Sequence, residues 1–353
     1  MDRLVNTIAT ADNWLAQVFH AIMMSIGFIA HMIVDFLWWL PGAVWWFVQW
    51  LPARLTGASD MSLPVGETAE RGFEYLQSGA NAFFDGMSDV FGAIIATVEA
   101  ILMRPPGENW IRGRGFEPQF EFWNEATHPF VVILAFAVIA WILQRNWKIS
   151  LLIVVGFLFV IDQDYWEPTM QSMALVLTAC IVCMGVGVPI GIAVAHRPKL
   201  YRAIVPVLDL MQTLPTFVYL IPAIVFFGIG TVPGLIATVV FVLPAPIRLT
   251  QLGISSTPTP LLEAAQAFGA TRRQVLWKVE LPSALPQIMA GLNQTIMLSL
   301  SMVVIAALVG ASGLGVPVLR ALGQVNTALG FESGFIIVVV AIMLDRMLRV
   351  TKT

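Results

Sequence analysis

The sequence predicts an all-α integral membrane protein: a polytopic helical bundle with about seven core transmembrane helices, plus N-terminal membrane-associated helices. First, 58% of the 353 residues are hydrophobic and 12% are charged, whereas soluble domains carry about 25% charged residues. Second, several apolar runs approach the length of about 20 residues that crosses a bilayer. Third, basic residues collect in every second loop between these runs, a pattern typical of multi-span membrane proteins.

Residues 1–127 are predicted to form an N-terminal extension with one span and with amphipathic or interfacial helices. The apolar run at about 14–51 is rich in tryptophan, which prefers the headgroup zone, so a span followed by an interfacial helix is expected. In this run His31 and Asp35 stand at i and i+4, which favours an interhelical polar contact over a metal site. Residues 67–103 repeat apolar side chains at helical spacing with acidic residues between them. This pattern predicts an amphipathic helix on the membrane or against the bundle, and not a span.

Residues 128–353 are predicted to form the transmembrane core, with a polar loop at 255–283. Seven apolar runs can be distinguished in it, at roughly 129–143, 148–165, 170–195, 204–228, 232–254, 285–310 and 334–350. The third run contains Cys180 and Cys183 at C-x-x-C spacing. A thiolate is unfavourable in an apolar segment without a basic neighbour, so these two residues are expected to pack as small apolar side chains.

The loops between the runs differ in charge. Those after the first, third, fifth and seventh runs hold nearly all basic residues of the core: Arg145, Lys148, Arg197, Lys199, Arg202, Arg248, Arg272, Arg273, Lys278, Arg346, Arg349 and Lys352. The intervening loops hold only Arg320. Because positive residues mark the cytoplasmic side, the loop at 255–283 and the C-terminus are expected to be cytoplasmic.

The segment from Glu263 to Pro282, EAAQAFGATRRQVLWKVELP, is polar and basic between two apolar runs. Thr259 is expected to cap a short helix with Pro260 and Glu263 in its first turn, where an acidic side chain is favourable. Gly269 suits a left-handed C-terminal cap. A second helix would then carry Arg272, Arg273 and Lys278. Leu281 and Pro282 are expected to end it before the chain re-enters the membrane at Ser283.

Glu263-Ala264-Ala265, Gly269 and Leu281-Pro282 resemble the EAA loop of permease subunits in bacterial ABC importers. The stretches DLMQTLPTFVYL, FFGIGTVPG, LPAPIRLT and GLNQTIMLSLSMVVIAALVGASGLG look like the glycine betaine/proline betaine branch of that family. The similarity extends over about residues 170–350.

This resemblance implies an ABC importer permease fold and a multi-pass position in the bacterial cytoplasmic (inner) membrane. The expected substrates are quaternary ammonium or related methylamine osmolytes: glycine betaine, proline betaine, choline, carnitine or trimethylamine N-oxide. The expected partners are two copies of an ABC ATPase subunit, a second copy of the permease, an extracytoplasmic substrate-binding protein and the lipid bilayer. The residues expected to contact the ATPase are Glu263, Ala264, Ala265, Gly269, Arg272, Arg273, Leu281 and Pro282.

The chain carries no phosphate-loop motif, so it is expected to be a transport subunit and not an enzyme, with no cofactor or metal of its own. ATP and Mg would be used by the partner ATPase. The net charge of −3 gives no support for a nucleic-acid partner.

Polar and aromatic residues within the apolar runs are candidates for the substrate pathway: Asp209, Gln212, Thr213, Phe217, Tyr219, Asn293, Gln294 and Thr295. Intramembrane polar groups are functional candidates, but hydrogen bonding between helices explains amides and threonines equally well. Asp209 would either attract a cationic substrate or pair with Arg248. Pro215 and Pro222 are expected to kink the run at 204–228.

Two alternatives stay open. One is an ABC permease for another small solute, such as an amino acid or an organosulfonate. The other is an ion-driven secondary transporter, which would predict an inverted repeat and several buried carboxylates; no repeat is visible, and the polar loop would have no role in it.

Overall fold

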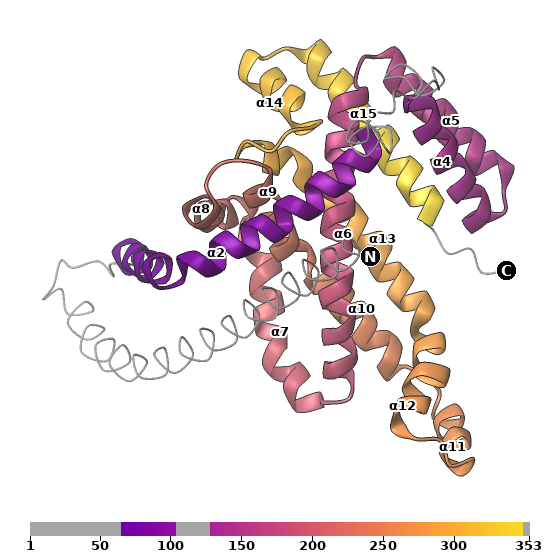
Figure 1. Cartoon of the computed structure of the whole chain (residues 1–353). Coiled ribbons are helices and arrows are strands. Elements are labelled where there is room, and N and C mark those ends of the chain that lie inside the picture. Colours follow the sequence, from indigo (N-terminus) through magenta and orange to yellow (C-terminus); the bar gives the residue numbers. More distant parts are fainter. Residues whose placement is uncertain (1–64, 104–127, 349–353) are drawn as a thin grey trace, which may run out of the picture. The chain divides into compact units, whose positions relative to one another are not determined.

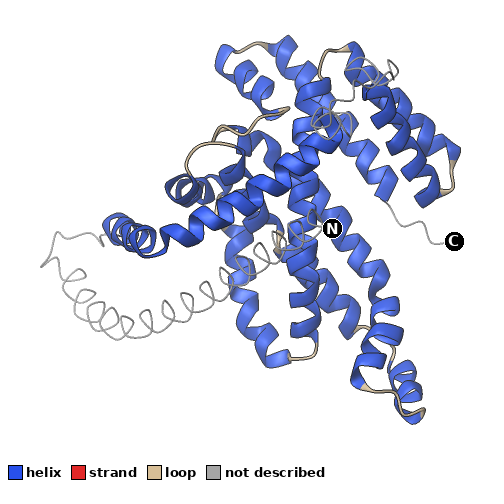
Figure 2. Ribbon diagram, in the orientation of Figure 1, coloured by secondary structure: helices blue, strands red, loops and turns tan. Residues whose placement is uncertain are grey.

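A computed structural model describes residues 65–103 and 128–348, and every regular element in these ranges is a helix (Figure 2). The prediction of an all-α membrane protein is therefore confirmed. The predicted span near residues 14–51, with His31 and Asp35, lies outside the described residues.

From α4 onward the helices follow one another along the chain with short connections (Figure 1). They are α2 (Val65–Met103), α4 (His128–Gln144), α5 (Trp147–Asp162), α6 (Trp166–Ala195), α7 (Pro198–Thr213), α8 (Thr216–Phe227), α9 (Thr231–Val242), α10 (Pro244–Ser255), α11 (Thr259–Ala267), α12 (Arg272–Val275), the π-helix η1 (Leu276–Glu280), α13 (Leu281–Ala307), α14 (Gly315–Gln324) and α15 (Thr327–Leu348).

Five helices of the described ranges are long and apolar enough to cross a membrane: Phe83–Met103, Trp166–Ala195, Thr231–Ser255, Arg272–Ala307 and Thr327–Leu348. The last four match four of the seven predicted runs. The run at 204–228 becomes two helices, α7 and α8, bent by 96°. The first two runs form α4 and α5, of 17 and 16 residues. At 1.5 Å per residue each rises about 25 Å, slightly less than the bilayer's hydrocarbon core.

The helix predicted at 67–103 is present as α2. Its second half, Phe83–Met103, passes the length and composition criteria for a span, contrary to the expectation that this helix is not a span. The acidic residues of that stretch are Asp85, Asp89 and Glu99, and the residues 90–98 between the last two carry no charge.

Contacts divide the chain into two units, Met1–Val90 and Phe91–Thr353. Inside the second unit, Ile95 near the end of α2 packs with Ala179 and Leu235. The predicted boundary at 127/128 stays a prediction, because residues 104–127 lie outside the described ranges.

The loops of the second unit alternate between two ends of the bundle. At one end, the amide of Gly230 donates to the carbonyl oxygen of Val309 (2.8 Å), and the amide of Leu314 donates to Ser172 Oγ (2.7 Å). At the other end lie α11 and α12, far from α14 (Figure 1). The alternation predicted from the charges is thus present in the fold of this part of the chain.

Small residues allow α6, α10 and α13 to pack closely at the centre of this unit. A Cβ atom on Gly191 of α6 would lie 2.6 Å from Thr250 Cβ of α10, and one on Gly187 would lie 2.8 Å from Pro246. On α10 itself, a Cβ on Gly253 would meet Gln287 and Ala284 of α13 at 2.9 and 3.0 Å. Close approach at small residues is how membrane helices gain packing energy when water supplies no driving force.

We expect Gly191→Ala to destabilise the bundle, because its methyl group has no space against Thr250 and Ile247. Overpacking of this kind costs about 1–3 kcal/mol, so the melting temperature in detergent should fall by several degrees. Gly185→Ala is the matched control on the same helix, since nothing lies within 4 Å of its added Cβ. Equal melting temperatures for the two variants would contradict this account of the packing.

Candidate functional site

The most exposed helical feature of the second unit is the connection between α10 and α13, residues 258–280, which we call the elbow (Figure 1). It consists of α11, a turn, α12 and the π-helix η1. No residue of α11 is buried, and α11 contacts both α12 and η1. The structure thus confirms two helical segments joined by a turn.

The start of α11 differs from the expectation. Pro258 occupies the N-cap position and no side chain caps the helix, so the prediction that Thr259 caps it was wrong. Thr259 and Pro260 are instead the first two helical residues, with Pro260 in the first turn as expected. Glu263 is consequently the fifth residue of α11, beyond the first turn, and its predicted place in that turn was wrong as well.

Gly269 ends α11 in the predicted left-handed conformation, with φ of +75°. The amide of Gly269 donates to the carbonyl oxygen of Gln266 (2.9 Å), and the amide of Ala270 donates to that of Ala265 (3.0 Å). This pair of hydrogen bonds is a Schellman motif, which satisfies the last carbonyl groups of the helix.

Thr271 begins the second helix of the elbow through a capping box. The Thr271 hydroxyl accepts a hydrogen bond from the Gln274 amide (3.4 Å), and the Gln274 side chain accepts one from the Thr271 amide (2.8 Å). The T-x-x-Q spacing is a sequence signal for this arrangement, and our sequence analysis missed it. Two adjacent caps therefore fix the turn between α11 and α12.

Leu281 and Pro282 do not end the second helix, which corrects the sequence-based expectation. Helix α12 passes through η1 into α13, so that residues Arg272–Ala307 form one continuous 36-residue helical segment. Pro282 stands in the first turn of α13, and because α13 continues directly from η1, its missing amide hydrogen removes one bond from the continuous ladder. Just before it, the amide of Leu281 reaches back five residues to the carbonyl oxygen of Leu276, so the wider π-turn carries the hydrogen-bond ladder up to the proline.

The elbow exposes both apolar and charged side chains. Glu263, Ala264, Gly269, Arg272, Arg273 and Pro282 are exposed, whereas Ala265 and Leu281 are half-buried. Phe268 is 92% exposed and Trp277 62% exposed. Large apolar side chains gathered on a polar segment are typical of a surface that another protein covers.

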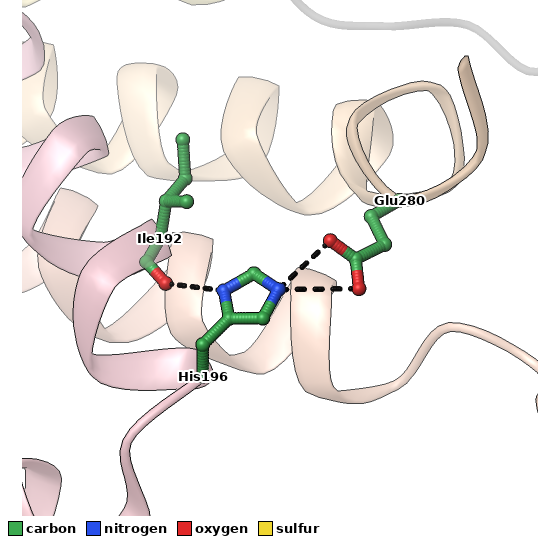
Figure 3. Close-up of polar contacts among 3 residues, drawn as sticks. All are labelled: Ile192, His196 and Glu280. Atoms are coloured by element: carbon green, nitrogen blue, oxygen red, sulfur yellow. Dashed lines mark hydrogen bonds and ion pairs between the residues drawn. The ribbon is translucent and has the colours of Figure 1, made fainter. Parts of the chain in front are cut away.

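Glu280, at the end of η1, contacts His196, which ends α6 (Figure 3). His196 Nε2 lies 2.9 Å from Glu280 Oε2 and 3.2 Å from Oε1, while Nδ1 lies 2.9 Å from the carbonyl oxygen of Ile192. Glu280 is only 8% exposed. Sequence reasoning missed this pair, since 84 residues separate its members.

The structure gives most of the polar pathway candidates on α7 and α8 local or interhelical partners. Asp209 pairs with Arg248 of α10 at 2.5 Å, which confirms the ion-pair alternative. The helix is interrupted at Leu214 and Pro215, between α7 and α8, in agreement with the predicted kink at Pro215. Pro222 lies inside α8. Across this break, the Tyr219 hydroxyl donates to the carbonyl oxygen of Met211.

The side chains of the remaining candidates on α7 and α8 are exposed or half-buried. Thr213 and Phe217 are exposed and Gln212 is half-buried.

The candidates on α13 fall into different environments. Asn293 Nδ2 donates to Asp345 Oδ1 of α15 (3.1 Å), and the buried Asn293 Oδ1 has no hydrogen-bond partner among the residues that the structure describes. The Thr295 hydroxyl donates to the carbonyl oxygen of Gly291 in its own helix (2.8 Å) and is fully buried, whereas Gln294 is exposed. Asp345 was missed although a carboxylate in the last apolar run is a signal in itself. Helix α10 contacts both α7 and α13, and α8 also contacts α13.

Cys180 and Cys183 are buried and unpaired in α6, as the packing interpretation expects. In residues 65–103 and 128–348, no group of three or more His, Cys, Asp or Glu side chains could hold a metal ion.

Comparisons with known proteins place these features in a family. Residues 187–350 match the family described as "Binding-protein-dependent transport system inner membrane component". The glycine betaine transport system permease protein OpuAB of Bacillus subtilis (strain 168) is 43% identical over 284 residues, which cover 80% of this chain and 93% of that protein.

Two further relatives extend the comparison. The glycine betaine/carnitine transport permease protein GbuB of Listeria monocytogenes serotype 1/2a (strain 10403S) is 48% identical, with 62% of this chain and 78% of that protein covered. The trimethylamine N-oxide transport system permease protein TmoV of Ruegeria pomeroyi (strain ATCC 700808 / DSM 15171 / DSS-3) is 36% identical, with 62% and 33% covered. The region matched by the family, residues 187–350, includes the elbow.

Proposed function

The chain belongs to the family of binding-protein-dependent transport system inner membrane components, and we propose that its substrate is a quaternary ammonium or related methylamine osmolyte. Its function is then that of a multi-pass permease subunit in an ATP-driven importer. The observation that carries the substrate class is the 43–48% identity to permeases of glycine betaine and of glycine betaine and carnitine. The more distant trimethylamine N-oxide relative fits the same chemistry, because all three solutes carry a methylated nitrogen.

The elbow supports an ATPase subunit as the partner of this chain. An importer that uses ATP needs a surface through which a separate nucleotide-binding subunit moves the membrane helices. The elbow offers exposed apolar side chains, Phe268 and Trp277, beside Glu263, Arg272 and Arg273. An ion-driven transporter would leave this surface without a role. In the proposed arrangement the elbow and the C-terminus face the cytoplasm, in agreement with the charges of the loops.

The transport cycle follows from the continuity of the elbow with the membrane helices. When two ATPase subunits close on ATP, each moves one elbow, and the displacement passes directly into α13 and, through Thr257, into α10. Two copies of this chain would enclose one pathway, each supplying half of it. A substrate-binding protein on the outer side would select the solute and release it into the outward-open state, and hydrolysis of ATP by the partner would restore the inward-open state.

The helices α7, α8 and α13 are the proposed source of pathway residues. The bend of 96° between α7 and α8 leaves Phe217 exposed, and an aromatic ring is suited to a methylated cation. Asp209 is held by Arg248, so its charge is compensated and it serves the pathway as part of that pair. The Thr295 hydroxyl bonds to the backbone of its own helix, so we propose a structural role for Thr295 and not a place in the pathway.

Uptake into liposomes tests the substrate class. The chain is reconstituted with its ATPase subunit and its binding protein, with ATP inside, and uptake of labelled glycine betaine is measured. Unlabelled proline betaine, choline, carnitine or trimethylamine N-oxide should compete, whereas taurine and an amino acid should not. If an amino acid or taurine blocks uptake and no methylated amine affects it, the proposed substrate class is wrong. The chain would then be a permease for an amino acid or an organosulfonate.

Glu263→Arg tests the role of the elbow. A reversed charge inside a desolvated protein contact costs about 2–5 kcal/mol, so we expect uptake to fall more than about tenfold while the chain still inserts in the membrane. The matched control is Lys199→Glu, which reverses an exposed charge outside the elbow. Co-purification of the ATPase subunit measures the docking itself. Unchanged uptake and unchanged co-purification in Glu263→Arg would rule out this contact as the site of coupling.

A further inference from the structure

The contact between His196 and Glu280 joins two elements that the chain itself does not connect (Figure 3). His196 ends α6, and Glu280 is the last residue of η1, directly before Leu281 and Pro282. Helices α10 and α13 are joined to the elbow covalently, whereas α6, which packs against both of them, contacts the end of the elbow through this pair of side chains.

The geometry of the contact suits a hydrogen-bonded pair of side chains. The carbonyl oxygen of Ile192 can only accept, so His196 Nδ1 carries a hydrogen. Nε2 faces both oxygens of Glu280. An imidazolium that donates to a carboxylate would satisfy every atom of this contact, and hydrogen bonds of that charge-assisted type are shorter and stronger than neutral ones.

The surroundings favour this ionic form. Glu280 is 8% exposed, and a carboxylate removed from water needs a charged or hydrogen-bonding partner. A cationic His196 lies at the C-terminus of α6, where positive charge interacts favourably with the helix dipole. The other basic side chains nearby in sequence, Arg197 and Lys278, are exposed. Arg248 of α10 pairs with Asp209.

We propose that His196 and Glu280 are positioning residues that carry the displacement of the elbow into α6, so that three central helices move together. This inference rests on the proposed function, since it assumes that the elbow is where ATP-driven work enters the chain. Glu280 stands at the base of the elbow, where the π-turn meets α13. Helix α6 continues through a short connection into α7 and the bend at Pro215. The link thus extends the movement from α10 and α13 to the α6–α7 pair.

The experiment measures the number of glycine betaine molecules transported per ATP hydrolysed, with the complete transporter in liposomes. His196→Leu combined with Glu280→Leu removes the link without leaving a buried charge. We expect ATP hydrolysis to continue and transport per ATP to fall about tenfold, the factor that corresponds to one charge-assisted hydrogen bond. Glu167→Gln, an exposed glutamate of α6 bonded only to Gln171 in the contacts of the described residues, is the matched control and should keep the parent ratio.

Exchange of the partners separates a positioning role from a general loss of stability. His196→Glu combined with Glu280→His restores an ionic pair and should recover most of the transport per ATP. If the leucine pair assembles and keeps the parent ratio, the link has no part in coupling. If the leucine pair does not assemble, Glu280→Gln decides, because it keeps the shape and removes the charge. In that variant a lowered ratio supports the link and an unchanged ratio overturns it.

Failure of the proposed function would look different. If the parent transporter moves no methylated amine, or if Glu263→Arg leaves uptake intact, the substrate class or the elbow's role fails. An unchanged ratio in the leucine pair, with Glu263→Arg still inactive, would overturn the His196–Glu280 link alone.

Discussion

The missing amide hydrogen of Pro282 is the constraint on which the rest of this structure depends. A proline at the boundary between a surface loop and a membrane helix would ordinarily separate the two, because it removes one hydrogen bond of the ladder. Here η1 bridges the boundary with a π-turn, in which Leu281 bonds back to Leu276. The elbow and α13 are consequently one continuous helical segment, and a force applied to the elbow acts directly on a helix that reaches the opposite end of the bundle.

Local caps and close helix contacts extend this continuity. The Schellman motif at Gly269 and the capping box at Thr271 fix α11 against α12, so that the tip of the elbow is attached to the helical segment. In the bundle, glycines such as Gly191 and Gly253 allow α10 to pack closely against both α6 and α13. A tightly packed group of helices transmits displacement because packed interiors deform little.

The sequence predicted the features that depend on local chemistry. The left-handed Gly269, the break at Pro215 and the Asp209–Arg248 pair follow from backbone preferences or from charge near one end of the bundle. Leu281–Pro282 was misread as a helix end because a proline tolerated in the first turn of a helix looks the same in sequence as one that stops it. Thr259 was misread as a cap because Pro258 already occupies that position. The contacts His196–Glu280 and Asn293–Asp345 join residues far apart in sequence, and only the packing of the helices brings them together.

In the proposed cycle the elbow and α13 move as one rigid body. Distances between spin labels at Phe268→Cys and Leu285→Cys, both exposed positions, test it most directly in the assembled transporter with and without ATP, with Cys180 and Cys183 replaced by alanine. We predict one narrow distance that is the same in both states, while a second label pair at Phe268 and Gly323 changes. A distance between Phe268 and Leu285 that shifts or broadens on addition of ATP would show a hinge at the π-turn and contradict the account.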